Sequence, residues 1–136
     1  EGTSDLHLMN ASAPVFICSD PLKTALFYEN NCGFATYHLD DESMPHIRIS
    51  RDNIDIVLIA SKNGANTVLN REAYGIAYDM YIYASEPKML EIELSGKGVK
   101  IIKPLPEPTE SSNINREFVF EDIDGRHICV SQREAM

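Results

Sequence analysis

Cysteines, basic residues and long apolar runs are all scarce in this sequence, and each shortage excludes a class of protein. Its three cysteines, Cys18, Cys32 and Cys129, are widely spaced and form no CxxC pair. Because an odd count argues against a disulfide framework, we expect buried, reduced thiols. No apolar run approaches the ~18 residues that a membrane span needs, and no charged segment followed by an apolar one opens the chain. These absences predict a soluble, cytoplasmic protein that does not interact with membranes.

The shortage of basic residues makes the chain acidic. Lys and Arg number 12 against 21 Asp and Glu, a formal net charge of −9. Such a surface repels phosphate backbones, which argues against nucleic acid as a partner. It either keeps the protein in solution or attracts a cationic small molecule, and solubility is the more common reason. The 136 residues, of which 43% are hydrophobic and 24% charged, suit one globular domain.

The strongest structural signal is the segment 118–130, Phe-Val-Phe-Glu-Asp-Ile-Asp-Gly-Arg-His-Ile-Cys-Val. Asp124-Gly125 between two apolar runs predicts a β-hairpin, because Gly125 accepts a positive φ and Asp124 tolerates one. A fainter copy lies half a chain earlier, with runs at 46–50 and 54–60 on either side of Arg51-Asp52-Asn53. The repetition predicts a duplicated architecture.

Each half shows the same order of one strand, one helix and three strands. In the first half a strand at 13–19 leads to Asp20-Pro21, an acidic N-cap followed by Pro at the first helical position. Gly33 is placed to end this helix in a left-handed conformation. In the second half a strand at 78–83 leads to a helix between Pro87 and Gly98. Strands are also expected at 34–39, 99–102, 115–120 and 126–132, with a linker over 61–74.

These patterns predict an α+β fold of two tandem βαβββ units. An N-terminal arm, 1–12, precedes a single domain, 13–132, with one unit at about 13–61 and the other at about 76–132. Each helix buries its apolar stripe on one face of a curved mixed sheet. The opposite faces then surround a cup, where a small ligand is expected.

The chain resembles the vicinal oxygen chelate superfamily, in its glyoxalase, bleomycin-resistance and dioxygenase branch. The resemblance rests on residues in family order and spacing: Asp20, Phe27-Tyr28-Glu29, Gly33-Phe34, Leu94, Lys97-Gly98-Val99 and the 118–125 segment. It implies the paired βαβββ fold predicted above. It also implies a homodimer, since family members commonly pair their sheets across a two-fold axis, which covers open strand edges.

Enzymes of that superfamily hold a divalent metal in the cup through His, Gln or Glu. The resemblance carries those ligand positions to Ala13, Val57, Asp79 and Cys129. Ala and Val cannot ligate, and Asp79 with Cys129 mixes a hard oxygen with a soft thiol. A catalytic metal generally needs three protein ligands. We therefore expect no metal and no cofactor.

Polar and aromatic side chains on the predicted strands supply candidate ligand contacts. Asp79 and Tyr81 share one strand face, and we expect Arg116 or a cationic ligand to pair with Asp79. Arg48 and Arg116 each stand just before an apolar run, where either can hold a ligand carboxylate. The alternative for any one residue is ordinary strand packing or a surface position. The candidate set is Asp79, Tyr81, Arg116, Arg48, His46, Tyr37, Phe118 and Cys129.

Three functions remain open at this point. The favoured one is a metal-free binding protein of the bleomycin-resistance type, whose cup takes a small organic molecule, aromatic or cationic. The second is a metal-dependent lyase, isomerase or dioxygenase of the same superfamily, with ligands drawn from Asp55, Asp79, His46 and His127. The third is an interaction module whose cup is filled by its own side chains. Ala13, Val57 and Cys129 favour the first over the second.

Overall fold

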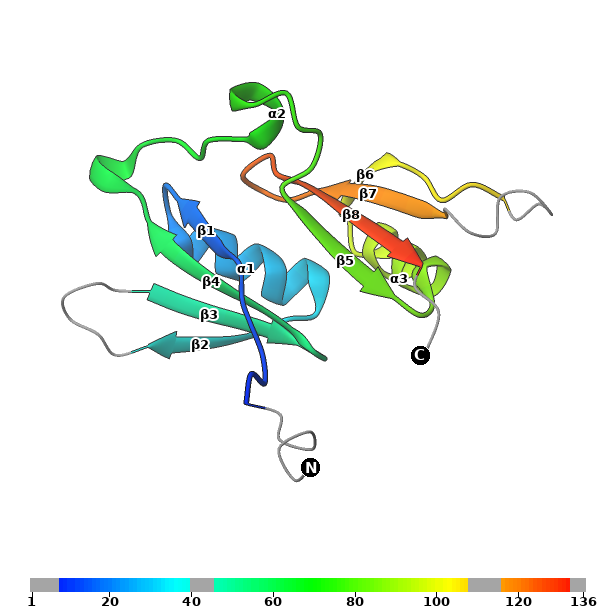
Figure 1. Ribbon diagram of the computed structural model, residues 1–136, viewed down its shortest axis with the longest axis horizontal. Helices are drawn as coiled ribbons and strands as arrows, with labels where there is room; N and C mark the ends of the chain where they lie inside the picture. The colour runs from blue at the N-terminus through cyan, green and yellow to red at the C-terminus, as the bar shows by residue number, and fades with distance from the viewer. Residues whose placement is uncertain (1–7, 40–45, 108–115, 133–136) are drawn as a thin grey trace.

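The computed structural model describes residues 8–39, 46–107 and 116–132, which form two four-stranded mixed sheets (Figure 1). The first has the order β1-β4-β3-β2, with β1 at Val15–Cys18, β2 at Ala35–Leu39, β3 at His46–Arg51 and β4 at Ile54–Ala60. The second repeats it as β5-β8-β7-β6, with β5 at Met80–Ala84, β6 at Lys100–Lys103, β7 at Glu117–Glu121 and β8 at His127–Gln132. The predicted α+β fold with two βαβββ units is confirmed.

One long helix covers each sheet. Helix α1, Pro21–Cys32, begins where expected, because the Asp20 carboxylate accepts a hydrogen bond from the backbone N–H of Lys23 at 3.3 Å. It ends at Gly33, whose φ of 73° is left-handed, as predicted. Helix α3 spans Pro87–Gly96. Both helices lie behind their sheets in Figure 1, so the uncovered faces turn to the same side of the molecule.

The connection between the sheets contains more structure than the sequence predicted. It holds a short 3-10 turn, η2, at Lys62–Gly64 and one helical turn, α2, at Asn70–Ala73. The hydroxyl of Thr67 donates to the carbonyl oxygen of Ile17 at 3.1 Å, which ties the connection to β1. No helix in the described ranges combines the length and apolar character that crossing a membrane requires.

The core lies between the sheets and their helices. Alternate strand residues point toward the helices and are buried: Phe16, Cys18, Ile47, Ile49, Ile56 and Leu58 in the first sheet, and Ile82, Phe118, Phe120, Ile128 and Val130 in the second. Tyr28 of α1 and Leu94 of α3 belong to the same continuous cluster. The prediction that Phe118 lines the cup is therefore wrong, because this side chain has no exposed surface and lies in the core.

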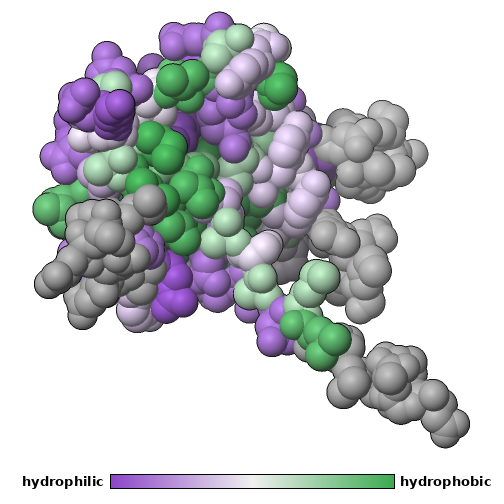
Figure 2. Space-filling view, turned by 60° about the vertical axis from the view of Figure 1, so that its left-hand side comes forward, coloured by the Kyte–Doolittle hydropathy of each residue, from purple (hydrophilic) through white to green (hydrophobic). Residues whose placement is uncertain are grey.

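The faces turned away from the helices are called the open faces below. On the second sheet the middle of this face, Val119 and Cys129, is buried, with 2% and 0% exposed. On the first sheet, Val15 is 53% exposed and Ile17 is 46% exposed. Figure 2 shows apolar side chains gathered on this side of the molecule. Apolar surface of this kind, next to polar side chains, is typical of a binding face.

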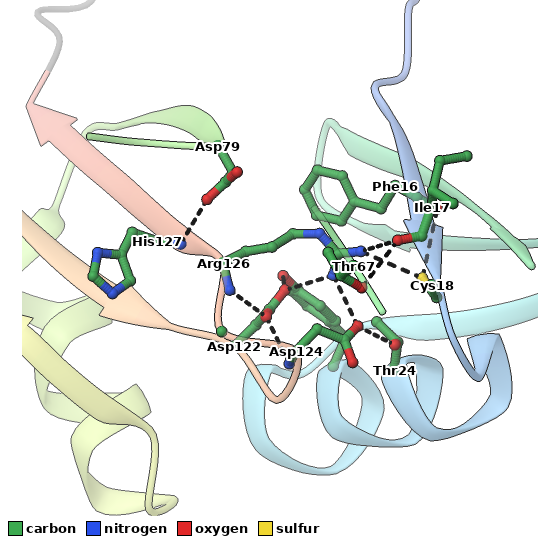
Figure 3. Close-up of polar contacts among 12 residues, drawn as sticks. Phe16, Ile17, Cys18, Thr24, Thr67, Asp79, Asp122, Asp124, Arg126 and His127 are labelled. Atoms are coloured by element: carbon green, nitrogen blue, oxygen red, sulfur yellow. Dashed lines mark hydrogen bonds and ion pairs between the residues drawn. The ribbon is translucent and has the colours of Figure 1, made fainter. Parts of the chain in front are cut away.

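The β7–β8 turn joins the two halves through a buried charge cluster (Figure 3). The guanidinium of Arg126, whose side chain is 3% exposed, donates to Asp122 Oδ2 at 3.1 Å and to Asp124 Oδ2 at 2.9 Å. It also donates to the carbonyl oxygen of Ile17 at 2.8 Å and lies 4.3 Å from the ring centroid of Phe16. The turn of the second half thus serves as a cap on the first strand of the chain.

Helix α1 receives the same turn from the other side. Thr24 donates its hydroxyl hydrogen to Asp124, and the Tyr28 hydroxyl donates to Asp122 Oδ2 at 2.8 Å. Burial, followed by the charge of Asp122, raises the pKa of Tyr28 well above its ordinary value. A second junction lies at the other end of α1, where both Nη atoms of Arg51 donate to Glu93 of α3.

Candidate functional site

The open face of the first sheet presents an apolar and aromatic row across its four strands. Val15 pairs with Val57, Val57 with Arg48, and Arg48 with Tyr37. The guanidinium of Arg48 lies 4.8 Å from the centroid of the Tyr37 ring, and both side chains are exposed. Arg48 and Tyr37, both predicted candidates, therefore stack on each other. In the next row His46, a further candidate, pairs with Ile59 on the same face.

The open face of the second sheet carries Tyr81 and Tyr83, and Tyr78, two residues before β5, packs on Tyr81; the three are here called the aromatic shelf. The rings of Tyr78 and Tyr81 meet edge to face, with 5.5 Å between their centroids. Tyr81 is 55% exposed and Tyr83 is 56% exposed. Half-exposed tyrosines with one ring already held by another provide flat contact area at low entropic cost.

A thiol and a carboxylate lie beside the shelf. Cys129 pairs with Tyr81 on one side and with Val119 on the other. Its Sγ donates to Glu117 Oε2 at 3.0 Å. Burial, then this hydrogen bond to a carboxylate, raises the pKa of Cys129 to about 11. The group is therefore a protonated thiol at neutral pH, which makes it a poor nucleophile.

The carboxylate of Asp79 is engaged by the backbone. Oδ1 accepts from the N–H of Asn70 and Oδ2 from the N–H of His127, each at 3.0 Å. The side chain fastens the connection between the halves to the start of β8, as Figure 3 shows for His127. Asp79 lies just before β5, the strand that holds Tyr81, rather than in that strand as predicted, and both of its oxygens already accept hydrogen bonds.

The structure does not bring Arg116 to Asp79. The carbonyl oxygen of Arg116 accepts from the N–H of Gln132, at the far end of β8 from His127. Its Nε donates to the carbonyl oxygen of Pro106 at 3.3 Å. The expected pairing is wrong because β7 runs antiparallel to β8, so the start of β7 lies beside the end of β8, whereas Asp79 lies at the start of β5 and β8.

Solved structures share this architecture over nearly their whole length. A glyoxylase/bleomycin resistance protein/dioxygenase domain from Frankia sp. aligns with a TM-score of 0.70 over 96% of both chains, at 15% identity. A member of the glyoxalase/bleomycin resistance protein/dioxygenase superfamily from Sphaerobacter thermophilus gives 0.66 at 17% identity, over 93% of this chain and 100% of that one. TioX from Micromonospora sp. gives 0.66 at 10% identity, over 92% and 100%.

The chain has the vicinal oxygen chelate fold. Identities this low show the fold alone. No family of known sequences and no curated protein matches this sequence at a significant level.

In the vicinal oxygen chelate fold, the four ligand positions inferred from the resemblance fall on residues that do not suit a metal. Ala13 and Val57 have no side-chain donor atom, Asp79 accepts two backbone hydrogen bonds, and the Cys129 thiol is engaged with Glu117. Among the described residues, no group of three or more His, Cys, Asp or Glu side chains is placed to hold an ion. The donor set therefore does not fit the fold's divalent metal.

The alternative ligands form no such group among the described residues either. His46 lies on the first sheet, where Asp55 accepts a hydrogen bond from Ser50. His127 lies on the second, and its Nε2 is 3.2 Å from Glu121 Oε2. The two histidines thus occupy different open faces of the vicinal oxygen chelate fold, each beside partners of its own.

Glu117 is the site residue that the sequence interpretation missed. The run 117–121 alternates Glu117, Val119 and Glu121 with the aromatic Phe118 and Phe120. A period of two puts the carboxylates on one face and the phenylalanines on the other. This alternation was the available signal, and it would have placed Glu117 near the cup and Phe118 in the core.

Proposed function

We propose that the protein binds a small organic molecule, aromatic or cationic, on the open faces of its two sheets, without a divalent metal. The observation that carries this proposal is the aromatic shelf with Glu117 and Cys129 beside it. Tyrosine rings attract flat or cationic groups through dispersion and the ring quadrupole. Glu117, with a side chain 24% exposed and Oε2 4.0 Å from Lys103 Nζ, adds a carboxylate next to them.

The first sheet supports the same proposal from the opposite half. Val15 and Ile17 offer apolar area on the same side of the molecule as the shelf. Arg48, held against Tyr37, has no carboxylate partner among the described residues, so its fork can take an acidic group of the same ligand. A ligand with a flat cationic part and an acidic part suits both faces.

Binding of an aromatic cation tests the proposal directly. We expect 1-methylquinolinium to bind the purified chain in isothermal titration calorimetry, and quinoline, uncharged at pH 8, to bind more weakly. Tyr81→Ala should weaken the cation about tenfold, since an exposed cation–π contact and its ring area contribute about 1 kcal/mol or more. Glu117→Gln should reduce the difference in affinity between 1-methylquinolinium and quinoline. Tyr74→Ala, at an exposed tyrosine of the connection, serves as the matched control.

Two results contradict the proposal. Unchanged binding by the Tyr81→Ala variant removes the shelf from the site. Stoichiometric nickel, zinc, iron or manganese that survives dialysis, and without which the probe does not bind, supports a metal-dependent lyase, isomerase or dioxygenase instead.

A further inference from the structure

A cavity lies between the two halves of the molecule, beside helix α3. A cleft of about 840 Å³ separates the β3–β4 hairpin from α3. Its floor consists of the core residues Phe34, Ile82, Leu94 and Phe120, each less than 10% exposed. Small-molecule pockets usually measure about 300–1,000 Å³. Of the shelf residues, Tyr83 alone also lines this cleft.

One wall of the cleft is apolar and exposed. Met89 and Ile92, three residues apart on α3, are 67% and 61% exposed and line the cleft. Large apolar side chains at this exposure, directly beside a buried apolar floor, form surface that an apolar ligand can cover. The side chain of Met89 is long and unbranched, and that of Ile92 is branched next to the backbone. Together they suit a flexible aliphatic chain better than a rigid ring.

The charged residues of the cleft are mostly carboxylates. Among the described residues, Arg51 is the one cation in the lining. Its Nη atoms donate to Glu93 at 2.8 and 2.9 Å and to the carbonyl oxygen of Cys32 at 2.9 Å. Asp52, with a side chain 85% exposed, touches only the Nε edge of Arg51 at 3.6 Å. The carboxylate of Glu86 makes no hydrogen bond or ion pair within the described part of the chain, and only its backbone carbonyl oxygen accepts, from the N–H of Leu90 at 3.2 Å. Three carboxylates against one occupied guanidinium leave the cleft negative.

We propose that this cleft binds an aliphatic ammonium ion. The alkyl chain covers Met89 and Ile92 over the apolar floor, and the ammonium group is held by the carboxylates of Asp52 and Glu86. A fatty carboxylate of the same length meets two negative charges and is rejected. This ligand class differs from the flat cation of the open faces, and the inference does not rest on the function proposed for them.

Methyl NMR on the full chain locates the site. Octylammonium should shift the methyl signals of Met89 and Ile92 in a saturable way, while the methyl signals of Val119, on the open face of the second sheet, stay in place. Octanoate should bind the same methyls at least about fivefold more weakly, because each exposed charge contributes a fraction of a kcal/mol. Shifts confined to Val119, or equal affinity for the two probes, overturn the proposal.

Matched charge variants test the carboxylates. Asp52→Asn with Glu86→Gln should weaken octylammonium about fivefold and leave octanoate no weaker. Position 52 has a φ of 52°, a left-handed conformation that Asn tolerates well, so the hairpin is retained. The control pair, Glu72→Gln with Glu107→Gln, removes the same charge at exposed positions outside the cleft. If both double variants weaken octylammonium binding equally, the effect comes from net charge alone and the proposal is overturned. A dimer in which a second copy buries Met89 also overturns it.

Discussion

Replacing Arg126 by Met tests the charge cluster that joins the two halves. The guanidinium is the only cation within bonding distance of Asp122, whose side chain has no exposed surface, and of Asp124, whose side chain is 11% exposed, within the described residues. The variant leaves two buried carboxylates facing each other. Removing one member of a buried pair costs about 3–5 kcal/mol, out of a total stability of about 5–15 kcal/mol. We expect a loss near the upper end, because Arg126 also donates to Ile17.

The stability lost in the Arg126→Met variant should increase as the pH rises, whereas ordinary acid denaturation removes stability as the pH falls. Burial raises the pKa of Asp122 above 3.8, and the charge of Arg126 partly offsets this. Without Arg126 the pKa of Asp122 rises further. A carboxyl group whose pKa is higher in the folded state binds more protons folded than unfolded, so the free energy of unfolding falls as the pH rises above 3.8. The variant should therefore lose more stability relative to the wild type at pH 7 than at pH 4.5.

Urea denaturation followed by far-UV circular dichroism at both pH values measures this. Lys23→Met removes a positive charge from an exposed position of α1 and should change the stability by less than about 0.5 kcal/mol. A loss below about 1 kcal/mol for Arg126→Met at pH 7, or the same loss at both pH values, refutes the reasoning about the buried cluster.

Three further outcomes are expected. Hydrogen bonds from Arg51 lower the pKa of Glu93, so this pair stabilises the fold above pH 4.5, and its contribution is lost as the pH falls through the lowered pKa. In urea denaturation at several pH values, Glu93→Gln should therefore make the free energy of unfolding fall less steeply with acid. Iodoacetamide should label Cys129 slowly at pH 8, and Glu117→Gln should speed the labelling because it lowers the pKa of the thiol. An unchanged labelling rate in the variant would count against the hydrogen bond. Light scattering should show a dimer at micromolar concentration, and a monomer alone would contradict the pairing of exposed strand edges.

The fold was predictable because the residues that begin and end its helices and form its turns act locally. Asp20-Pro21 and Gly33 mark the two ends of α1, and Asp124-Gly125 marks the β7–β8 turn, where Gly125 has a φ of 93°. Each of these residues acts within its own turn of the chain. The repeated order of elements then left one fold class that buries both helices.

The site was less predictable because it depends on contacts across the chain. Parity alone placed Asp79 and Tyr81 on one face, but it could not show that two distant backbone N–H groups occupy Asp79. The pairing of Arg116 with Asp79 failed because it depends on strand direction. The link between Arg51 and Glu93 joins two halves whose relative placement no local pattern contains.

The cap that Arg126 places on β1 has a consequence for biosynthesis. The first sheet and α1 leave the ribosome long before residue 126, at roughly 5–20 residues per second. Until then the carbonyl oxygen of Ile17 lacks this donor, and Thr24 and Tyr28 lack their carboxylate partners, Asp124 and Asp122. The N-terminal half therefore stays incomplete until the last hairpin of the chain has been synthesised. Chains truncated before this turn should be bound by chaperones or degraded by proteases.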